Sequence, residues 1–383
     1  MTARSARPYR ISIPQERLER IRVKLEAADF TYAPADDSGW RYGTDIRYLR
    51  EFVSYWLRQY DWRAAEVELN RLPQFMAEVD GHNVHFYHVR GKGPSPLPLL
   101  LTHGWPGSTY EFFGVIERLT DPARYGGDAR DAFDLIVPSL PGYGPSQRPP
   151  TPIGPRYTAS LWRKLMTDVL GYSRFVAQGG DWGSAVTSWL GATAPEVAGI
   201  HLNLCVPPAV AAEQTGTEER EWRARFEAVQ RQASAYMMLH MTKPQTIAIA
   251  LSDTPLGYAA WVLEKFHGWG DTHGNIESRF SKDQLITNLM IHLTNDAVTS
   301  MIWSYVGAAM EVRRGEHAGL RVDKPTAVAL YPAEFLPPPP RSVAERVWNI
   351  TRWTQMPAGG HFAAFEEPVA FAADVTEAFR PLR

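Results

Sequence analysis

The sequence predicts an α/β protein with a doubly wound, mostly parallel sheet, a helical segment before the sheet and a helical insertion within it. Short apolar runs alternate with amphipathic stretches from residue 97 to 204. Such alternation favours a parallel sheet, because parallel strands need crossover connections that helices usually supply. The alternation stops at residue 206 and resumes near residue 326, which indicates the insertion. The 383 residues are 44% hydrophobic and 21% charged, as expected of a large globular chain.

Hydrophobic periodicity gives the elements in chain order. Helices are expected at 18–28, 44–60, 108–119, 158–170, 183–194, 218–241, 254–266, 282–292 and after 365. Strands are expected at 75–79, 84–89, 97–102, 133–137, 174–178, 199–204, 326–330 and 351–355. The first two strands flank Asp80-Gly81, a dipeptide typical of a tight hairpin turn.

These elements divide the chain into three predicted parts. Residues 1–74 form an N-terminal helical segment, 75–206 and 306–383 form the α/β core, and 207–305 form a helical cap, or lid. An all-helical stretch of about this length inside an α/β sheet is typical of a cap over the strand ends.

Composition excludes several classes of partner. A net charge of -2 leaves no basic footprint for nucleic acid or for an anionic membrane surface. Cys205 is the only cysteine, which excludes an internal disulfide and a cysteine-built metal site. No apolar run approaches the ~20 residues of a membrane helix, and the polar start is not expected to act as a Sec-type signal. We therefore expect a cytoplasmic protein that uses no metal and no cofactor.

The segment Gly-Gly-Asp-Trp-Gly at 179–183 lies between a predicted strand and a predicted helix. This is the nucleophile elbow of α/β-hydrolases, with Asp181 where serine usually stands. A simpler interpretation is a glycine-rich turn in which Asp181 caps the helix. The elbow is favoured by His-Gly-Trp-Pro-Gly at 103–107 after an earlier strand, by Glu334 after the strand ending at 331, and by His361 after the last strand. The order Asp, Glu, His predicts the α/β-hydrolase fold, and the strands expected above give it an eight-stranded sheet.

An aspartate nucleophile restricts the substrate. Serine attacking a saturated carbon would leave an ether, whereas Asp181 would leave an ester that water can open. Its carboxylate, with an ordinary pKa of ~3.9, is already ionised at neutral pH. His361, held by Glu334, would then deprotonate water, and the backbone N–H groups of Trp105 and Trp182 would stabilise the oxyanion. The substrate is thus an epoxide or an alkyl halide.

The leaving group separates these two substrates. An opening epoxide develops an alkoxide and needs a proton donor such as tyrosine (pKa ~10), whereas a halide leaves without a proton. The insertion contains Tyr236 and Tyr258 and ends at Tyr305. Each of these rings could instead serve packing, and residue type alone leaves that open.

Several motifs together identify a family. They are Ile-Ser-Ile-Pro at 11–14, Tyr-Asp-Trp-Arg at 60–63, His-Gly-Trp-Pro-Gly-Ser at 103–108, Pro-Ser-Leu-Pro-Gly-Tyr-Gly at 138–144, Gln-Gly-Gly-Asp-Trp-Gly-Ser at 178–184, Thr-Lys-Pro at 242–244 with Ser-Asp-Thr-Pro at 252–255, and Gly-Gly-His-Phe-Ala-Ala-Phe-Glu-Glu-Pro at 359–368. Over nearly its whole length the chain resembles the microsomal-type epoxide hydrolases, and within them a soluble, bacterial-type member.

The resemblance implies that an epoxide is opened to a vicinal diol, with Asp181 as nucleophile, His361 as base, Glu334 as its orienting acid and Tyr236 as one epoxide-activating tyrosine. It also implies that the N-terminal segment wraps core and lid, and that the Trp105-Pro106 peptide is cis. We expect a small apolar epoxide and water as substrates, and a homodimer as the assembly.

Two functional residues of the family cannot be assigned to positions of this sequence by simple counting. The second lid tyrosine of the family follows a Thr-rich stretch, here 294–300, and counting onward leads to Ser304 or Tyr305. Only Tyr305 can donate a phenolic proton, so it is assigned. The proline-rich loop after Glu334 blurs the register, and Asp323 is the other candidate acid.

Two other functions remain open. Haloalkane dehalogenases also have a tryptophan after the nucleophilic aspartate, as Trp182 stands here; the N-terminal helical segment and the cap tyrosines argue against this activity. A non-catalytic binding protein on the same fold is the second alternative. The complete set of Asp181, Glu334 and His361 argues against that one.

Overall fold

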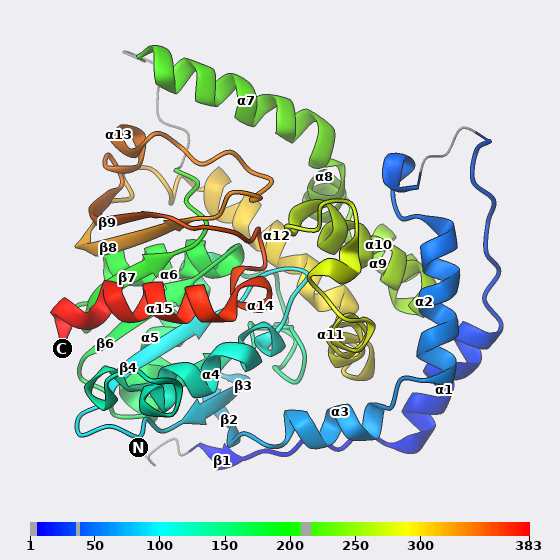
Figure 1. Ribbon diagram of the computed structural model, residues 1–383, viewed down its shortest axis with the longest axis horizontal. Helices are drawn as coiled ribbons and strands as arrows, with labels where there is room; N and C mark the ends of the chain where they lie inside the picture. Colours follow the sequence, from blue (N-terminus) through cyan, green and yellow to red (C-terminus); the bar gives the residue numbers. More distant parts are fainter. Residues whose placement is uncertain (1–5, 36–38, 208–215) are drawn as a thin grey trace.

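The computed structural model describes residues 6–35, 39–207 and 216–383 (Figure 1). One sheet runs through the molecule in the order β1-β2-β3-β5-β4-β6-β7-β8-β9. The six strands from β5 to β9 in this order are parallel, and β1, β2 and β3 add an antiparallel edge. The strands are β1 (Arg7–Pro8), β2 (Gln74–Val79), β3 (His82–Val89), β4 (Leu97–Thr102), β5 (Phe133–Pro138), β6 (Phe175–Gly179), β7 (Val197–Leu202), β8 (Val322–Leu330) and β9 (Trp348–Gln355). The predicted mostly parallel sheet is confirmed.

Among the described residues the sheet has nine strands, so the prediction of eight was wrong. The additional strand, β1, pairs antiparallel with β2 through Arg7 and Met76, and the Tyr9 N–H donates to Gln74 O at 2.9 Å. A two-residue strand is too short to show a period of two in the sequence. Its pairing covers the edge of β2, which would otherwise expose unpaired backbone groups.

The predicted hairpin is confirmed between β2 and β3. Asp80 and Gly81 have φ angles of 48° and 78°. Two consecutive positive φ angles are the signature of the tight turn that matches the twist of paired strands.

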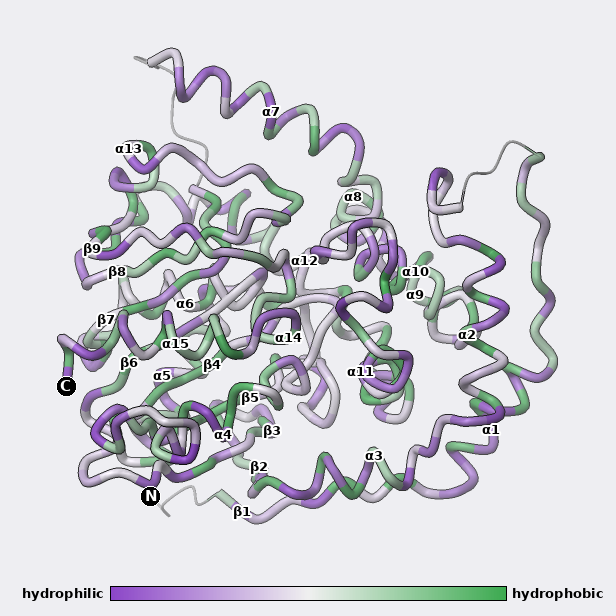
Figure 2. The backbone as a smooth tube through the Cα atoms, in the orientation of Figure 1, coloured by the Kyte–Doolittle hydropathy of each residue, from purple (hydrophilic) through white to green (hydrophobic). Residues whose placement is uncertain are grey.

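Helices cover both faces of the sheet. The pleat of β4 shows this directly, because Leu99 and Leu101 belong to one buried cluster and Leu100 to the other. On the face of Leu99 and Leu101 lie α4 (Phe113–Thr120), α14 (Ala363–Glu366) and α15 (Pro368–Phe379). On the face of Leu100 lie α5 (Pro155–Lys164) and α6 (Trp182–Thr193). The short α13 (Arg341–Ala344) joins β8 to β9. Figure 2 shows hydrophobic residues concentrated along the central strands.

The chain between β7 and β8 is helical, as predicted. Its helices are α7 (Thr217–Ala233), α8 (Ala235–Thr242), α9 (Pro244–Asp253), α10 (Pro255–Trp269), α11 (Lys282–Thr294) and α12 (Val298–Arg313). The predicted helix at 218–241 is broken at Ser234 into α7 and α8. The first residues predicted for the cap, 208–215, lie outside the described part of the chain.

The N-terminal segment lies against the outside of these helices (Figure 1). It consists of α1 (Gln15–Glu26), α2 (Ile46–Arg58) and α3 (Trp62–Leu69). Lys24 Nζ is 2.6 Å from Asp253 Oδ1, and Thr44 Oγ1 donates to Ala260 O at 2.5 Å. Across residues 6–35, 39–207 and 216–383, no single helix is long and apolar enough to cross a membrane. The pair α9 and α10 passes by length and composition but is bent by 114°.

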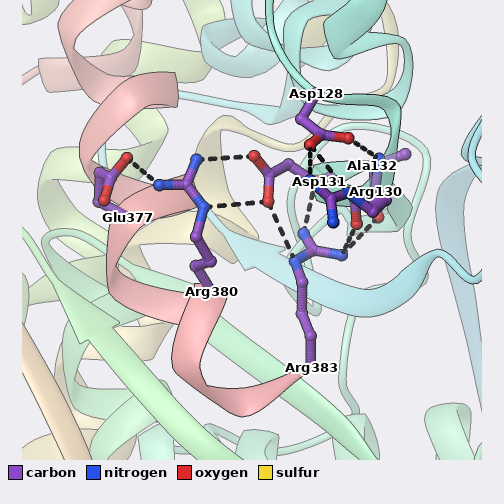
Figure 3. Close-up of polar contacts among 7 residues, drawn as sticks. All are labelled: Asp128, Arg130, Asp131, Ala132, Glu377, Arg380 and Arg383. Carbon is purple, nitrogen blue, oxygen red and sulfur yellow. Dashed lines mark hydrogen bonds and ion pairs between the residues drawn. The ribbon is translucent and has the colours of Figure 1, made fainter.

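Hydrogen bonds and ion pairs hold the chain at the C-terminal end of α15 next to the start of β5 (Figure 3). The buried Asp131 carboxylate accepts from Arg380 at 2.7 and 3.2 Å, and Arg383 donates to Ala132 O at 3.0 Å. These contacts lie at the amino end of β5. The carboxyl ends of the parallel strands, where α/β folds place their sites, are at the other edge of the sheet.

Candidate active site

The turn between β6 and α6 carries Asp181. Its φ is 49°, a left-handed conformation that a non-glycine residue rarely adopts and that is concentrated at functional sites. The neighbouring glycines are needed for space: a Cβ on Gly179 would lie 2.1 Å from Gly183 O, and one on Gly183 would lie 1.9 Å from Thr102 O. This is the geometry expected of an elbow, in which Asp181 stands at the carboxyl edge of the sheet.

The structure brings the three predicted triad residues together. His361 Nε2 lies 3.4 Å from Asp181 Oδ2, and His361 Nδ1 lies 3.0 and 3.1 Å from the two Glu334 oxygens. The backbone also fixes them: the His361 N–H donates to Trp269 O at 3.0 Å, and the Glu334 N–H to Tyr331 O at 3.2 Å. The imidazole can therefore reach both carboxylates at once.

The second candidate acid, Asp323, is not part of this cluster. It stands at the amino end of β8, its side chain is 87% exposed, and it pairs with Arg321 at 3.3 Å. Glu334 follows the carboxyl end of the same strand and its side chain is buried.

Two carboxylates control the protonation of His361. Burial alone would lower the pKa of its imidazole, but the charges of Glu334, hydrogen-bonded to Nδ1, and of Asp181, 3.4 Å from Nε2, outweigh burial and hold the pKa well above its usual value. Esterification of Asp181 would remove one of those charges. The pKa of His361 would then fall, so that the same residue could accept a proton from water.

One of the two predicted oxyanion donors, the Trp105 N–H, contacts the Asp181 carboxylate. The Trp105 N–H donates to Asp181 Oδ1 at 2.7 Å, and a Cβ on Gly104 would lie 2.2 Å from the same oxygen. The Trp105–Pro106 peptide is cis, as the family resemblance implied. Trp182 is the first residue of α6, where backbone N–H groups have no partner within the helix.

The cap supplies two phenols to the same place. The Tyr236 ring, on α8, stacks on Trp105 with centroids 5.0 Å apart, and the Tyr305 ring, on α12, meets Trp182 edge-on at 4.8 Å. Burial, followed by the nearby Asp181 charge, raises the pKa of Tyr236. Burial, followed by the neighbouring Tyr236, raises the pKa of Tyr305. Both hydroxyls therefore keep their protons at neutral pH and can donate them.

The hydroxyls of the two other cap residues, Ser304 and Tyr258, face other partners. Ser304 Oγ donates to Met301 O at 2.8 Å and lies 3.1 Å from the Tyr143 hydroxyl. Tyr258 is fully buried, and its hydroxyl faces Met301 Sδ at 3.9 Å. The packing interpretation therefore applies to Tyr258. Of the two residues to which the count from 294–300 led, Tyr305 is the one whose ring lies at the site.

A cavity of ≈ 310 Å³ opens beside these groups. Asp181, Trp182, Tyr236 and Tyr305 line one end, and the rest of the wall is mostly apolar. The wall includes Trp189, Phe226, Val229, Phe335, Leu336 and Trp348. The sequence did not single out these residues, because they come from α6, α7, the loop after β8 and β9, and no local pattern links them. Among the residues described, no group of three or more metal-binding side chains could hold an ion.

Comparisons with known proteins agree with this geometry. A family model described as "Epoxide hydrolase N terminus" matches residues 6–112, and one described as "alpha/beta hydrolase fold" matches residues 98–232. A Stigmatella aurantiaca (strain DW4/3-1) protein assigned by name to the epoxide hydrolases is 40% identical, covering 98% of this chain and 85% of its own. "Epoxide hydrolase 1" of Sus scrofa is 34% identical, covering 97% and 88%.

Solved structures give the same result. The crystal structure of juvenile hormone epoxide hydrolase from the silkworm Bombyx mori superposes with a TM-score of 0.90 at 28% identity, covering 99% of this chain and 96% of its own. The Aspergillus niger epoxide hydrolase structure superposes with a TM-score of 0.87 at 29% identity, covering 100% and 97%. The predicted α/β-hydrolase fold is confirmed.

Proposed function

Because the chain belongs to the epoxide hydrolase family and is a hydrolase acting on epoxides, we propose that it opens the ring through a covalent ester on Asp181. The observation that supports this mechanism is that the Asp181 carboxylate lies 3.4 Å from His361 Nε2 and lines an apolar cavity together with two buried phenols. Nucleophile, base and proton donors are all needed when the leaving group is an alkoxide.

In the first step, Asp181 Oδ2 attacks a carbon of the epoxide and the ring C–O bond breaks. The Trp105 N–H holds Oδ1, which leaves Oδ2 as the attacking oxygen. The epoxide oxygen takes a proton from Tyr236 or Tyr305, since an unprotonated alkoxide is a poor leaving group. The product is a hydroxyalkyl ester of Asp181 and a tyrosinate.

In the second step, water attacks Cγ of Asp181 and gives one proton to His361 Nε2. Trp105 and Trp182 N–H groups stabilise the tetrahedral oxyanion on Oδ1. The bond from Cγ to the ester oxygen breaks, and the diol leaves with that oxygen and the proton from His361. The acid proton left on Asp181 returns to the tyrosinate, so one water is consumed and the enzyme is restored.

A single turnover of styrene oxide in heavy-oxygen water tests this mechanism. The first diol is expected to carry ordinary oxygen taken from Asp181, and the heavy oxygen is expected in the Asp181 carboxylate, both read by mass spectrometry. Heavy oxygen in the first diol with an unlabelled Asp181 would mean direct attack by water. A bromoalkane in parallel tests dehalogenation, for which we expect no halide release.

Tyr236→Phe is expected to slow ring opening by about 10²-fold while changing ester hydrolysis much less, because only the first step needs a phenolic proton. Stopped-flow single turnovers separate the two rates. Tyr258→Phe is the matched control, since it removes a buried hydroxyl of the same cap that lies away from the cavity. Equal slowing of both steps in Tyr236→Phe would indicate a packing role instead.

Other features of the protein stay predictions. The apolar wall of the cavity supports a small apolar epoxide as the substrate. The homodimer, the cytoplasmic location and the absence of nucleic-acid and membrane partners rest on the sequence, as does the division into segment, core and cap.

A further inference from the structure

A second, smaller pocket shares Asp181 with the cavity described above and reaches His361, which does not line that cavity. Asp181 and His361 line this space of ≈ 20 Å³ together with Thr102, Glu111 and Asn203. A polar pocket can hold one water when it offers roughly 10–15 Å³ and two to four polar partners. His361 Nε2 and Thr102 Oγ1 are buried and have no hydrogen-bond partner among the described residues. The pocket therefore has the volume and the free polar groups for a single ordered water.

Glu111 is the carboxyl group of this pocket. It lies in the short turn Thr109–Phe112 that follows the cis peptide. Its carboxyl group occupies the space that a side chain at position 107 would take, where the chain has glycine. A Cβ on Gly107 would lie 1.3 Å from Glu111 Oε1 and 2.5 Å from its Cδ. Burial, partly opposed by His361, raises the pKa of Glu111 to about 8. The group is therefore largely an uncharged acid at neutral pH, with a carbonyl oxygen that can accept a hydrogen bond.

Two other polar side chains of the pocket are already engaged on their acceptor atoms, whereas Thr102 Oγ1 can give or take a further hydrogen bond. Asn203 Oδ1 accepts from Gln178 Nε2 at 2.7 Å, and His103 Nε2 accepts from the Leu140 N–H at 3.1 Å. A water in the pocket has two protons to donate. His361 Nε2 can take one of them, and Glu111 offers a carboxyl acceptor for the other.

We propose that this pocket holds the water that hydrolyses the Asp181 ester, and that Glu111 is the residue that positions it; the proposal rests on the proposed function. The water donates one hydrogen bond to His361 Nε2 and the other to Glu111, which aims its lone pair at Cγ of Asp181. The proton that moves goes to His361, and Glu111 only holds the water in place. A correctly held reactant can account for a large part of a rate enhancement.

The test separates ester formation from ester hydrolysis in Glu111→Leu and Glu111→Gln. Trp105 and Trp182 beside Asp181 should report ester formation by stopped-flow fluorescence. Intact-protein mass spectrometry then follows the loss of the ester. In Glu111→Leu we expect ester formation close to the wild-type rate and ester hydrolysis slower by about 10²-fold. Glu111→Gln, whose amide oxygen can accept the same hydrogen bond, should recover most of the loss.

Glu311→Leu is the matched control. Glu311 is also a buried carboxyl lying against a glycine, since a Cβ on Gly154 would be 2.4 Å from its Cδ, but it caps α5 away from the pocket. Its substitution should leave the ratio of the two rates unchanged.

Three results overturn the assignment. The first is a Glu111→Leu variant that clears the ester as fast as wild type does, and the second is a Glu111→Gln variant that is as slow as Glu111→Leu. The third is the absence of any ester in wild type and in His361→Gln, which refutes the covalent mechanism as well. The first two leave the mechanism standing and refute only the role of Glu111.

Discussion

Replacement of Asp181 by alanine is expected to abolish epoxide hydrolysis, with turnover falling by at least about 10⁴-fold. The variant keeps the cavity, both phenols and the imidazole, but no atom remains that can form the ester. The residual rate should be that of water attacking a bound epoxide. Diol formation by chromatography measures the loss, and intact-protein mass spectrometry should find no adduct.

Asp323→Ala is the control for this change. The Asp323 side chain is 87% exposed at the other end of β8, so its removal should leave turnover unchanged. Thermal unfolding should show that Asp181→Ala is folded, so that the loss of turnover reports the missing carboxylate. Rapid diol formation by folded Asp181→Ala would show that another group attacks the epoxide.

His361→Gln is expected to form the ester and then retain it. Asp181 needs no base for its attack, because its carboxylate is ionised before the substrate arrives. The second step needs a base, and glutamine cannot take the proton of the attacking water. After mixing with styrene oxide, the protein mass should increase by the mass of one substrate, and a peptide containing Asp181 should carry the increase.

His273→Gln serves as the control, because the His273 side chain is 82% exposed and its Nε2 lies 3.1 Å from the carboxylate of Asp271, not of Asp181. It should turn over normally and accumulate no adduct. Full activity of His361→Gln without an adduct would mean that the base is another residue.

Much of the fold could be predicted because its signals are local. The apolar run of β4 and the Asp80-Gly81 turn can each be recognised within about ten residues. Two features could not. β1 has two residues, and only its pairing with β2 makes it a strand. The break at Ser234 lacks glycine and proline, so the sequence shows one continuous helical stretch where the structure has α7 and α8.

The site, like the fold, has residues that the sequence could place and residues that it could not. Asp181, Glu334 and His361 stand at strand ends in a fixed order, so the sequence could place them near one another, and the measured distances agree. Their catalytic roles stay predictions until the variants are made. The cavity wall and Glu111 could not be predicted, because their positions depend on which loops and helices meet in space.

The two phenols reside on α8 and α12, whereas the carboxylate they face stands on the rim of the sheet. A slight lifting of those helices would part donor from acceptor while leaving every strand intact. If the helices that carry the phenols move away from the sheet, the turnover rate is therefore expected to fall first. That fall would precede any spectroscopic change that reports on the strands.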